Sequence, residues 1–131
     1  MNILQVEKIN TFYGLSHILF DISLYIKKGE TISLLGRNGV GKSTTLKSII
    51  GLTPPRSGSI KFVGQEIRGL KPHRIAHLGI GYVPEDRIIF PDLTVRENLE
   101  MGIKSRNKDG DWTLEKIYQI FPILEERQRQ Y

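Results

Sequence analysis

Apolar and polar residues alternate along the early part of the chain, and a period of two is typical of β-strands. Residues 3–9 show this alternation and predict a first strand, which a short loop over residues 11–14 follows. Residues 18–26 alternate more regularly and predict a second strand. One face of this second strand is expected to carry Ile18, Phe20, Ile22, Leu24 and Ile26. Residues 31–35 form a short apolar run, which predicts a strand buried on both faces.

Helical spacing first appears after Lys42. Leu46, Ile49 and Ile50 predict a helix over residues 42–50, and Gly51 suits the position just after its C-terminus. A T-x-x-E capping box begins at Thr94 and predicts a helix that continues to about residue 103. The remaining predicted elements are a strand at 59–63, a helix at 72–77, a short buried strand at 80–83 and a helix at 112–121, with loops at 84–92 and 105–111.

A glycine-rich segment separates the predicted strand at 31–35 from the helix that follows. Residues 36–43 read GRNGVGKS and match G-x-x-x-x-G-K-[ST] at every fixed position. Glycines let the backbone curl so that its N–H groups converge on phosphate oxygens, and the N-terminus of the next helix favours negative charge. The strand before the loop and the helix after it are the context that separates a P-loop from an ordinary glycine-rich turn. The sequence therefore predicts a site for ATP and Mg²⁺, in which Lys42 reaches the phosphates and Ser43 the metal.

Four further segments, in a fixed order around this loop, point to a family. They are the loop that holds Tyr13, then TPPRSGSI at residues 53–60, GIGYVPE at 79–85 and LTVRENL at 93–99. Together they resemble the ATP-binding subunits of ABC transporters, and the resemblance covers essentially the whole chain. The longer run GIGYVPEDRIIFPDLTVRENLEMG is similar to the ATPases of branched-chain amino-acid importers in particular.

The resemblance implies roles for individual residues. Tyr13 matches the aromatic residue that stacks on adenine, although a half-buried loop aromatic is the alternative. Glu85 stands where the family usually carries a glutamine that reaches Mg²⁺ and the attacking water, and its alternative is a solvated loop charge. Lys42 and Glu85 are therefore the candidate catalytic residues, and Ser43 and Glu85 the candidate metal ligands. The expected phosphate and metal cradle consists of Gly36, Asn38, Gly39, Gly41, Lys42, Ser43 and Thr44.

The resemblance also implies an α/β fold of the ABC type of P-loop NTPase, with an antiparallel β subdomain and part of a parallel core sheet. Residues 1–85 would form the N-terminal part of the nucleotide-binding core, and residues 86–131 the start of a helical subdomain. Residues from about 86 to 103 match the region that contacts membrane-spanning subunits. Within it, Ile88, Ile89 and Phe90 form an apolar stretch with Arg87, and either a docking surface or local core packing explains them.

The machinery for hydrolysis is incomplete in this sequence. Hydrolysis also needs an aspartate at the end of an apolar strand, and the family adds an L-S-G-G-Q segment. Neither follows Glu85, so we expect a truncated front half that binds ATP but is inactive alone. Unpaired strand edges are expected to leave it marginally stable or prone to associate.

Composition narrows the choice of function. The net charge of +5 comes from scattered basic residues with no Lys/Arg block, so we expect no nucleic-acid partner. The chain has no cysteine, no secretory signal and no apolar run of about 18 residues, which favours a cytoplasmic protein. For the whole protein, the resemblance implies a pair of ATPase subunits on the inner face of the cell membrane that drives uptake of a small solute, such as branched-chain amino acids. A non-catalytic nucleotide-binding fragment, or an ABC-type ATPase that acts on ribosomes or DNA, is the alternative.

Overall fold

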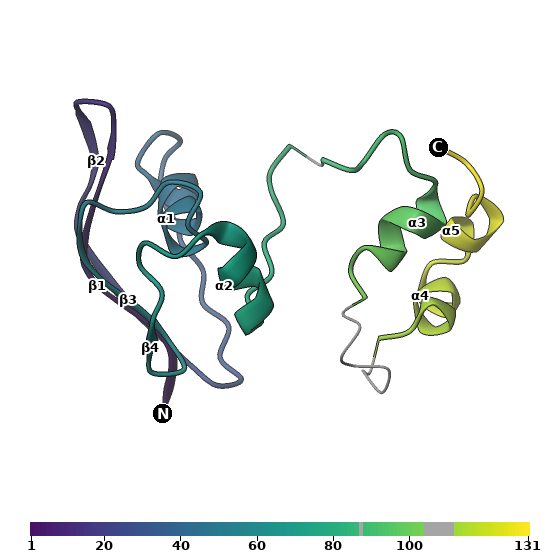
Figure 1. The fold of residues 1–131 in the computed structure, drawn as a ribbon, viewed down its shortest axis with the longest axis horizontal. Coiled ribbons are helices and arrows are strands. Elements are labelled where there is room, and N and C mark those ends of the chain that lie inside the picture. Colours follow the sequence, from purple (N-terminus) through teal and green to yellow (C-terminus); the bar gives the residue numbers. More distant parts are fainter. Residues whose placement is uncertain (87, 104–111) are drawn as a thin grey trace. The chain divides into compact units, whose positions relative to one another are not determined.

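The structure is a computed structural model that describes residues 1–86, 88–103 and 112–131. The chain divides into two compact units, Met1–Tyr82 and Val83–Tyr131. The first unit contains strands β1 (Asn2–Tyr13), β2 (Ser16–Lys27), β3 (Ser57–Phe62) and β4 (Gln65–Glu66), with helices α1 (Lys42–Ile49) and α2 (Pro72–Leu78). The second contains helices α3 (Val95–Glu100), α4 (Leu114–Ile120) and α5 (Pro122–Glu126) (Figure 1).

A four-stranded antiparallel sheet organises the first unit, in the order β2-β1-β3-β4. The strands β1 and β2 form a long hairpin in which Tyr13 pairs with Ser16. The chain turns between them at Gly14, whose φ of 58° favours glycine. The first strand is longer than predicted, because the segment expected to be a loop at residues 11–13 is still paired with β2.

Two irregularities in the hairpin change which side chains face inward. The pairing shifts register between Val6 and Ile9, where Lys8 has a φ of 46°, and again where Asp21 has a φ of 48°. Such a bulge moves the following side chains to the opposite face of the sheet. The prediction that Phe20 shares a face with the other apolar residues of β2 is therefore wrong: those residues pack against the core, whereas Phe20 is exposed and Leu19 is buried.

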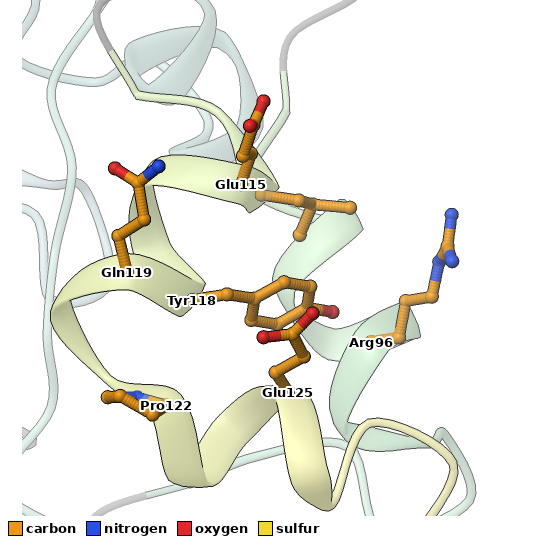
Figure 2. A pocket seen from close by; sticks show the side chains of 7 residues that line it. Arg96, Glu115, Tyr118, Gln119, Pro122 and Glu125 are labelled. Atoms are coloured by element: carbon orange, nitrogen blue, oxygen red, sulfur yellow. The ribbon is translucent and has the colours of Figure 1, made fainter.

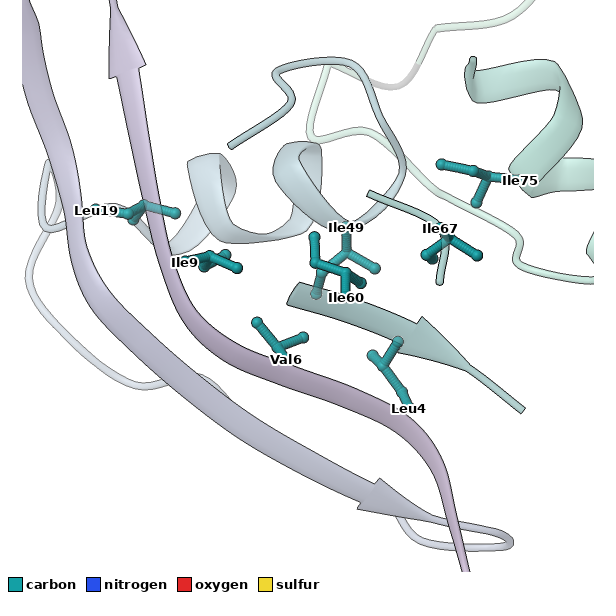
Figure 3. Close-up of a cluster of buried hydrophobic side chains, with 8 residues drawn as sticks. All are labelled: Leu4, Val6, Ile9, Leu19, Ile49, Ile60, Ile67 and Ile75. Atoms are coloured by element: carbon teal, nitrogen blue, oxygen red, sulfur yellow. The ribbon is translucent and has the colours of Figure 1, made fainter. Parts of the chain in front are cut away.

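The core of the first unit lies on one face of this sheet. Both α1 and α2 contribute to it, through Ile49 and Ile75 respectively (Figure 3). The remaining members come from the strands and from the segment after β4, and the complete cluster is Leu4, Val6, Ile9, Leu19, Ile49, Ile60, Ile67 and Ile75. Because α1 packs on the core directly after the glycine-rich loop, the core fixes the position of that loop's C-terminal end.

The predicted buried strands at residues 31–35 and 80–83 are wrong for this structure, in which neither segment pairs as a strand. Ile32, Leu34 and Leu35 are exposed, and so is Val83. A strand needs a hydrogen-bonded neighbour on at least one edge, and an apolar run without one remains an irregular segment. The described residues thus form the antiparallel β subdomain of the expected fold without parallel pairing beside it.

Local hydrogen bonds define the three helices of the second unit. The predicted capping box is confirmed: the Thr94 hydroxyl accepts from the Glu97 N–H, and the Glu97 carboxylate accepts from the Thr94 N–H at 2.8 Å. Thr113 caps α4 in a similar way, and Pro122 begins α5 rather than a last turn of α4. Helix α3 ends at Glu100, earlier than predicted, and the loop predicted at 105–111 lies outside the described residues. None of the helices in the described ranges is long and apolar enough to cross a bilayer.

Candidate functional site

The glycine-rich loop turns sharply into α1. Gly39 and Gly41 have φ values of 84° and 100°, in the left-handed region that glycine adopts without strain. At Gly41 a Cβ atom would lie 2.6 Å from the Leu19 side chain, so the helix start packs against β2 only because this residue lacks one. Helix α1 begins at the next residue, Lys42, and its first N–H groups have no carbonyl partner within the helix. These features suit the binding of an anion.

Lys42 lies across the loop that precedes it. Its Nζ atom donates hydrogen bonds to the carbonyl oxygens of Gly36, at 2.6 Å, and Arg37, at 2.8 Å. An ammonium group carries three N–H donors, so two of them hold the loop in its curled form and a third remains for a phosphate oxygen. The Lys42 ammonium group thus lies across a curled glycine-rich loop.

A buried hydrogen bond anchors α1 on the sheet. The hydroxyl groups of Thr11 on β1 and Ser48 on α1 lie 2.9 Å apart, and Ser48 also donates to the Thr44 carbonyl oxygen at 2.8 Å. Both hydroxyl-bearing residues are almost completely buried. Because an unpaired buried hydroxyl is costly, this contact favours one orientation of α1 on β1. It places the first turn of α1 close to the end of the hairpin.

Tyr13 lies at that end of the hairpin, next to the first turn of α1. Side-chain hydrogen bonds with Thr44 and, to a smaller extent, Thr53 lower the pKa of Tyr13, and the charge of Lys47 acts in the same direction. The structure therefore brings together two parts of the predicted site that are far apart in the sequence, namely Tyr13 and Thr44. The Tyr13 side chain is 46% exposed, which leaves ring surface accessible to a base.

The other predicted site residues divide into two groups. Ser43 and Thr44 are the second and third residues of α1, and Asn38 lies in the exposed turn before it. Glu85 is exposed and belongs to the second unit, so its role beside the metal remains a prediction.

His73 and His77 are both exposed, and His77 Nδ1 lies 2.6 Å from the His73 carbonyl oxygen. Across the described ranges no three His, Cys, Asp or Glu side chains cluster as a metal site.

A family model described as "ABC transporter" matches residues 19–131. The chain belongs to the ABC transporter family. It is 42% identical, over 97% of its length, to the "High-affinity branched-chain amino acid transport ATP-binding protein BraG" of Pseudomonas aeruginosa. It is 39% identical, over 83% of its length, to the "Lipopolysaccharide export system ATP-binding protein LptB" of Haemophilus influenzae.

The fold agrees with that assignment. A solved structure titled "Structure of ATP binding subunit of ABC transporter" superposes with a TM-score of 0.81 at 30% identity and matches 98% of this chain. The ABC chain spans about half of each of these proteins: 55% of the P. aeruginosa protein, 45% of the H. influenzae protein and 54% of the solved structure.

The second unit of the ABC chain presents an exposed apolar segment before α3. Ile88, Ile89 and Phe90 are 68%, 64% and 56% exposed, so local core packing does not explain them. Asn98 on α3 holds the end of this segment, because its side chain accepts from the Phe90 N–H at 2.9 Å and donates to the Phe90 carbonyl oxygen at 3.0 Å. Arg87, the polar member of the predicted stretch, lies outside the described residues.

The second unit also contains a pocket of about 470 Å³ among its helices (Figure 2). The Tyr118 side chain extends across it, and the Tyr118 hydroxyl is buried without a hydrogen-bond partner among the described residues. Arg96, at the rim, forms an ion pair of 2.8 Å with Glu100. None of the predicted site residues lines this pocket, so it is distinct from the P-loop site.

Sequence reasoning missed Arg56, which precedes β3. Its guanidinium group donates to the Gly14 carbonyl oxygen and lies over the Phe12 ring, at 4.3 Å from the ring centroid. Residue 56 belongs to the segment TPPRSGSI, and nothing in the local sequence indicates that this segment reaches the hairpin that carries Tyr13. Only the pairing of β1 with β3 brings the two together.

Proposed function

We propose that this chain binds ATP and Mg²⁺ through its P-loop, and that the whole protein uses ATP hydrolysis to drive uptake of a small solute by an ABC importer. The observation that carries the proposal is the arrangement around Lys42, whose ammonium group spans the curled loop at the N-terminus of α1. Positive charge, N–H groups at a helix start and a glycine at a left-handed φ, where other residues are strained, are features that suit a triphosphate.

Individual residues have separate roles in this proposal. Lys42 contacts the phosphates and offsets their charge, while Gly36, Asn38, Gly39 and Gly41 shape the backbone around them. Ser43 offers its hydroxyl to the metal, and Thr44 continues the cradle. Tyr13 stacks on adenine. Glu85, brought near by the fold of the whole protein, orients the attacking water and contributes a metal ligand. The bound metal would neutralise charge that develops on the phosphates.

Branched-chain amino acids are the solute class we propose. The run over residues 79–102 resembles the ATPases of such importers, and the P. aeruginosa relative is named for this transport. The H. influenzae relative, named for lipopolysaccharide export, is almost as similar in its matched part. Substrate identity therefore rests on the resemblance of this run and not on the P-loop, which every member needs.

We propose two protein partners for the whole protein. Membrane-spanning subunits would dock on residues 86–103, where Ile88, Ile89 and Phe90 are exposed and Asn98 fixes the end of the segment. A second ATPase subunit would complete the ATP site. This places the protein at the inner face of the cell membrane. Taken alone, the 131-residue chain is proposed to bind nucleotide without hydrolysing it, because the strand aspartate that organises the metal in this type of site does not follow Glu85.

The test is a titration of this chain with ATP and Mg²⁺, with phosphate release followed in the same samples. The variant Lys42→Ala is expected to weaken binding by about 10- to 100-fold, because hydrogen bonds to a charged group are among the strong ones. The matched control is Lys71→Ala, which removes an exposed lysine at the start of α2 and should leave binding unchanged.

No phosphate release is expected from the chain or from either variant. Equal binding by the chain and by Lys42→Ala, with circular dichroism showing both folded, would refute the P-loop site. Sustained phosphate release that is lost in Lys42→Ala would instead refute the proposal that the chain is catalytically incomplete.

A further inference from the structure

Arg56 contacts both residues that flank Tyr13 in the chain. Its Nη2 atom donates to the carbonyl oxygen of Gly14, and its guanidinium group lies over the ring of Phe12. The backbone N–H of Arg56 also donates to the Asn10 carbonyl oxygen on β1, at 2.8 Å. One side chain from the turn before β3 thus holds the end of the hairpin on both sides of a single tyrosine.

The Phe12 ring is held on its two faces. His17 stacks on it with the ring centroids 4.1 Å apart and an angle of 9° between the planes. Arg56 lies 4.3 Å from the same centroid, and two groups this close must occupy opposite faces of the ring. A planar guanidinium group is well suited to such a stack, in which it combines attraction to the ring with hydrogen bonding at its edge. Phe12 is therefore fixed, and with it the backbone of the next residue.

Tyr13 lies between these two contacts at the end of the hairpin, and its side chain is 46% exposed. Side-chain hydrogen bonding with Thr44, in the first turn of α1, and with Thr53 lowers the pKa of Tyr13. The end of a two-residue hairpin loop is ordinarily among the more mobile parts of a fold. At this one, Arg56 holds the residues on both sides of Tyr13.

We propose that Arg56 is a positioning residue for the adenine base, which holds Tyr13 in the place where a nucleotide bound at the P-loop presents its base. This inference rests on the proposed binding of ATP at this loop. Arg56 does not contact the phosphates in this proposal. Its effect arises because a ring that is already ordered loses less conformational freedom when the base stacks on it.

The proposal makes the effect of Arg56 specific to the base. Loss of the Arg56 side chain should weaken the binding of ATP. It should not change the affinity for a ligand that has the phosphates but no base. The test therefore compares two probes, ATP with Mg²⁺ and inorganic tripolyphosphate with Mg²⁺, by calorimetric titration of the 131-residue chain. The measured quantity is the ratio of the two affinities, which a general loss of folded protein does not change.

Four single variants and one double variant are compared with the unaltered chain. Tyr13→Leu removes the stacking ring and should weaken ATP binding by about 5- to 50-fold while leaving tripolyphosphate binding unchanged. Arg56→Ala should weaken ATP binding by about 3- to 10-fold, again without effect on tripolyphosphate. Arg56→Lys keeps the charge but lacks the planar fork, so it should recover only part of the loss. Arg74→Ala, an exposed arginine on α2, is the control and should change neither probe.

The double variant Arg56→Ala, Tyr13→Leu is the decisive one. If Arg56 acts through Tyr13, the double variant binds ATP no more weakly than Tyr13→Leu alone. Additive losses, or equal losses for both probes in Arg56→Ala, would overturn the positioning role. A loss of ATP affinity in Tyr13→Leu but not in Arg56→Ala would overturn this inference and leave the proposed ATP site intact. Failure of the unaltered chain to bind either probe would overturn both.

Discussion

The two units of this chain are stabilised in different ways. The first unit buries apolar side chains from three strands, two helices and the segment after β4 against one face of a sheet, and every fully buried apolar side chain in the described ranges belongs to it. The second unit has no fully buried apolar residue on any of its three helices, and its contacts are mostly capping and backbone hydrogen bonds. For example, the N–H groups of Val95 and Arg96 at the start of α3 donate to the carbonyl oxygens of Gln130 and Gln128.

This difference bears on the glycine-rich loop at residues 36–43, which lies in the first unit. Apolar burial supplies most of the stability of a folded unit, whereas short helices with exposed apolar faces gain little from propensity alone. The P-loop lies in the unit with the core, next to a helix that packs on it. The segment proposed to dock on membrane subunits lies in the unit without one. Predictions that separate the two units test this contrast.

The largest effect is expected from a change in the core of the first unit. Ile60, at the centre of β3, is completely buried, so Ile60→Ala should lower the free energy of unfolding by about 3 kcal/mol. The matched variant Ile123→Ala, on a half-exposed residue of α5, should change it by less than about 0.5 kcal/mol. Urea unfolding measures both. Ile60→Val, expected to cost about 1 kcal/mol, serves if the alanine variant does not fold. Equal costs at residues 60 and 123 would refute the contrast between the units.

A smaller effect is expected where α1 joins the sheet. Thr11→Val keeps nearly the same side-chain shape but removes the buried hydroxyl, which leaves Ser48 without that partner. The substitution should lower the free energy of unfolding by about 1–2 kcal/mol. Adding Ser48→Ala removes the hydroxyl that has lost this partner, and the double variant should be less destabilised than the sum of the single ones. The measurement is a double-mutant cycle in urea. Strict additivity would mean that the contact between α1 and β1 does not contribute to the first unit's stability.

Residue patterns predicted the local elements of this chain well and their surroundings poorly. The pattern GRNGVGKS followed by helical spacing predicted the turn into α1, and the T-x-x-E pattern predicted the cap of α3, because both depend on neighbours in sequence. The inner face of β2 was misassigned at Phe20, because a bulge at Asp21 changes the register and leaves no mark in a periodic pattern. The segment 31–35 has the composition of a buried strand but no paired neighbour.

The candidate site shows the same limit. The cradle residues are contiguous in sequence and could be named from the motif, whereas Tyr13 came only from the resemblance to a family. Its approach to Thr44 depends on the docking of α1 on β1, which no local pattern encodes. Arg56 was missed because its role arises from the pairing of β1 with β3.

The third effect should be confined to the second unit. Thr94→Ala removes the hydroxyl that accepts from the Glu97 N–H, so amide exchange in α3 should accelerate about fivefold. Amides of β1 and β3 should exchange at their original rates, because no core residue of the first unit depends on this cap. Hydrogen exchange followed by NMR measures both regions, with Thr31→Ala, at an exposed position of the first unit, as the control variant. Equal acceleration in β1 would show that the two units open together and would refute their independence.

The smallest effect concerns Glu66, a carboxylate on the short strand β4, and it depends on pH. Burial raises the pKa of Glu66, but hydrogen bonds from the Ser59 hydroxyl and from the backbone N–H groups of Ile60 and Arg68 outweigh it, and the pKa lies below its usual value. A carboxyl group whose pKa is lower in the folded state stabilises the fold above its unfolded pKa and loses that contribution as the pH falls through its folded pKa.

Glu66→Gln should therefore cost about 0.5 kcal/mol at neutral pH, a small figure because the side chain is exposed. The cost should stay constant from about pH 8 to pH 6 and shrink below about pH 4.5, where Glu66 begins to take up a proton in the unfolded chain. Urea unfolding of both proteins across this range measures it. Glu97 in α3 also has a pKa below its usual value, and both the unaltered chain and Glu66→Gln contain it. The difference in unfolding free energy between these two proteins therefore reports on Glu66 in the first unit. A cost that grows on acidification would contradict the sign, and would mean that the hydrogen bonds from Ser59, Ile60 and Arg68 do not favour the charged form.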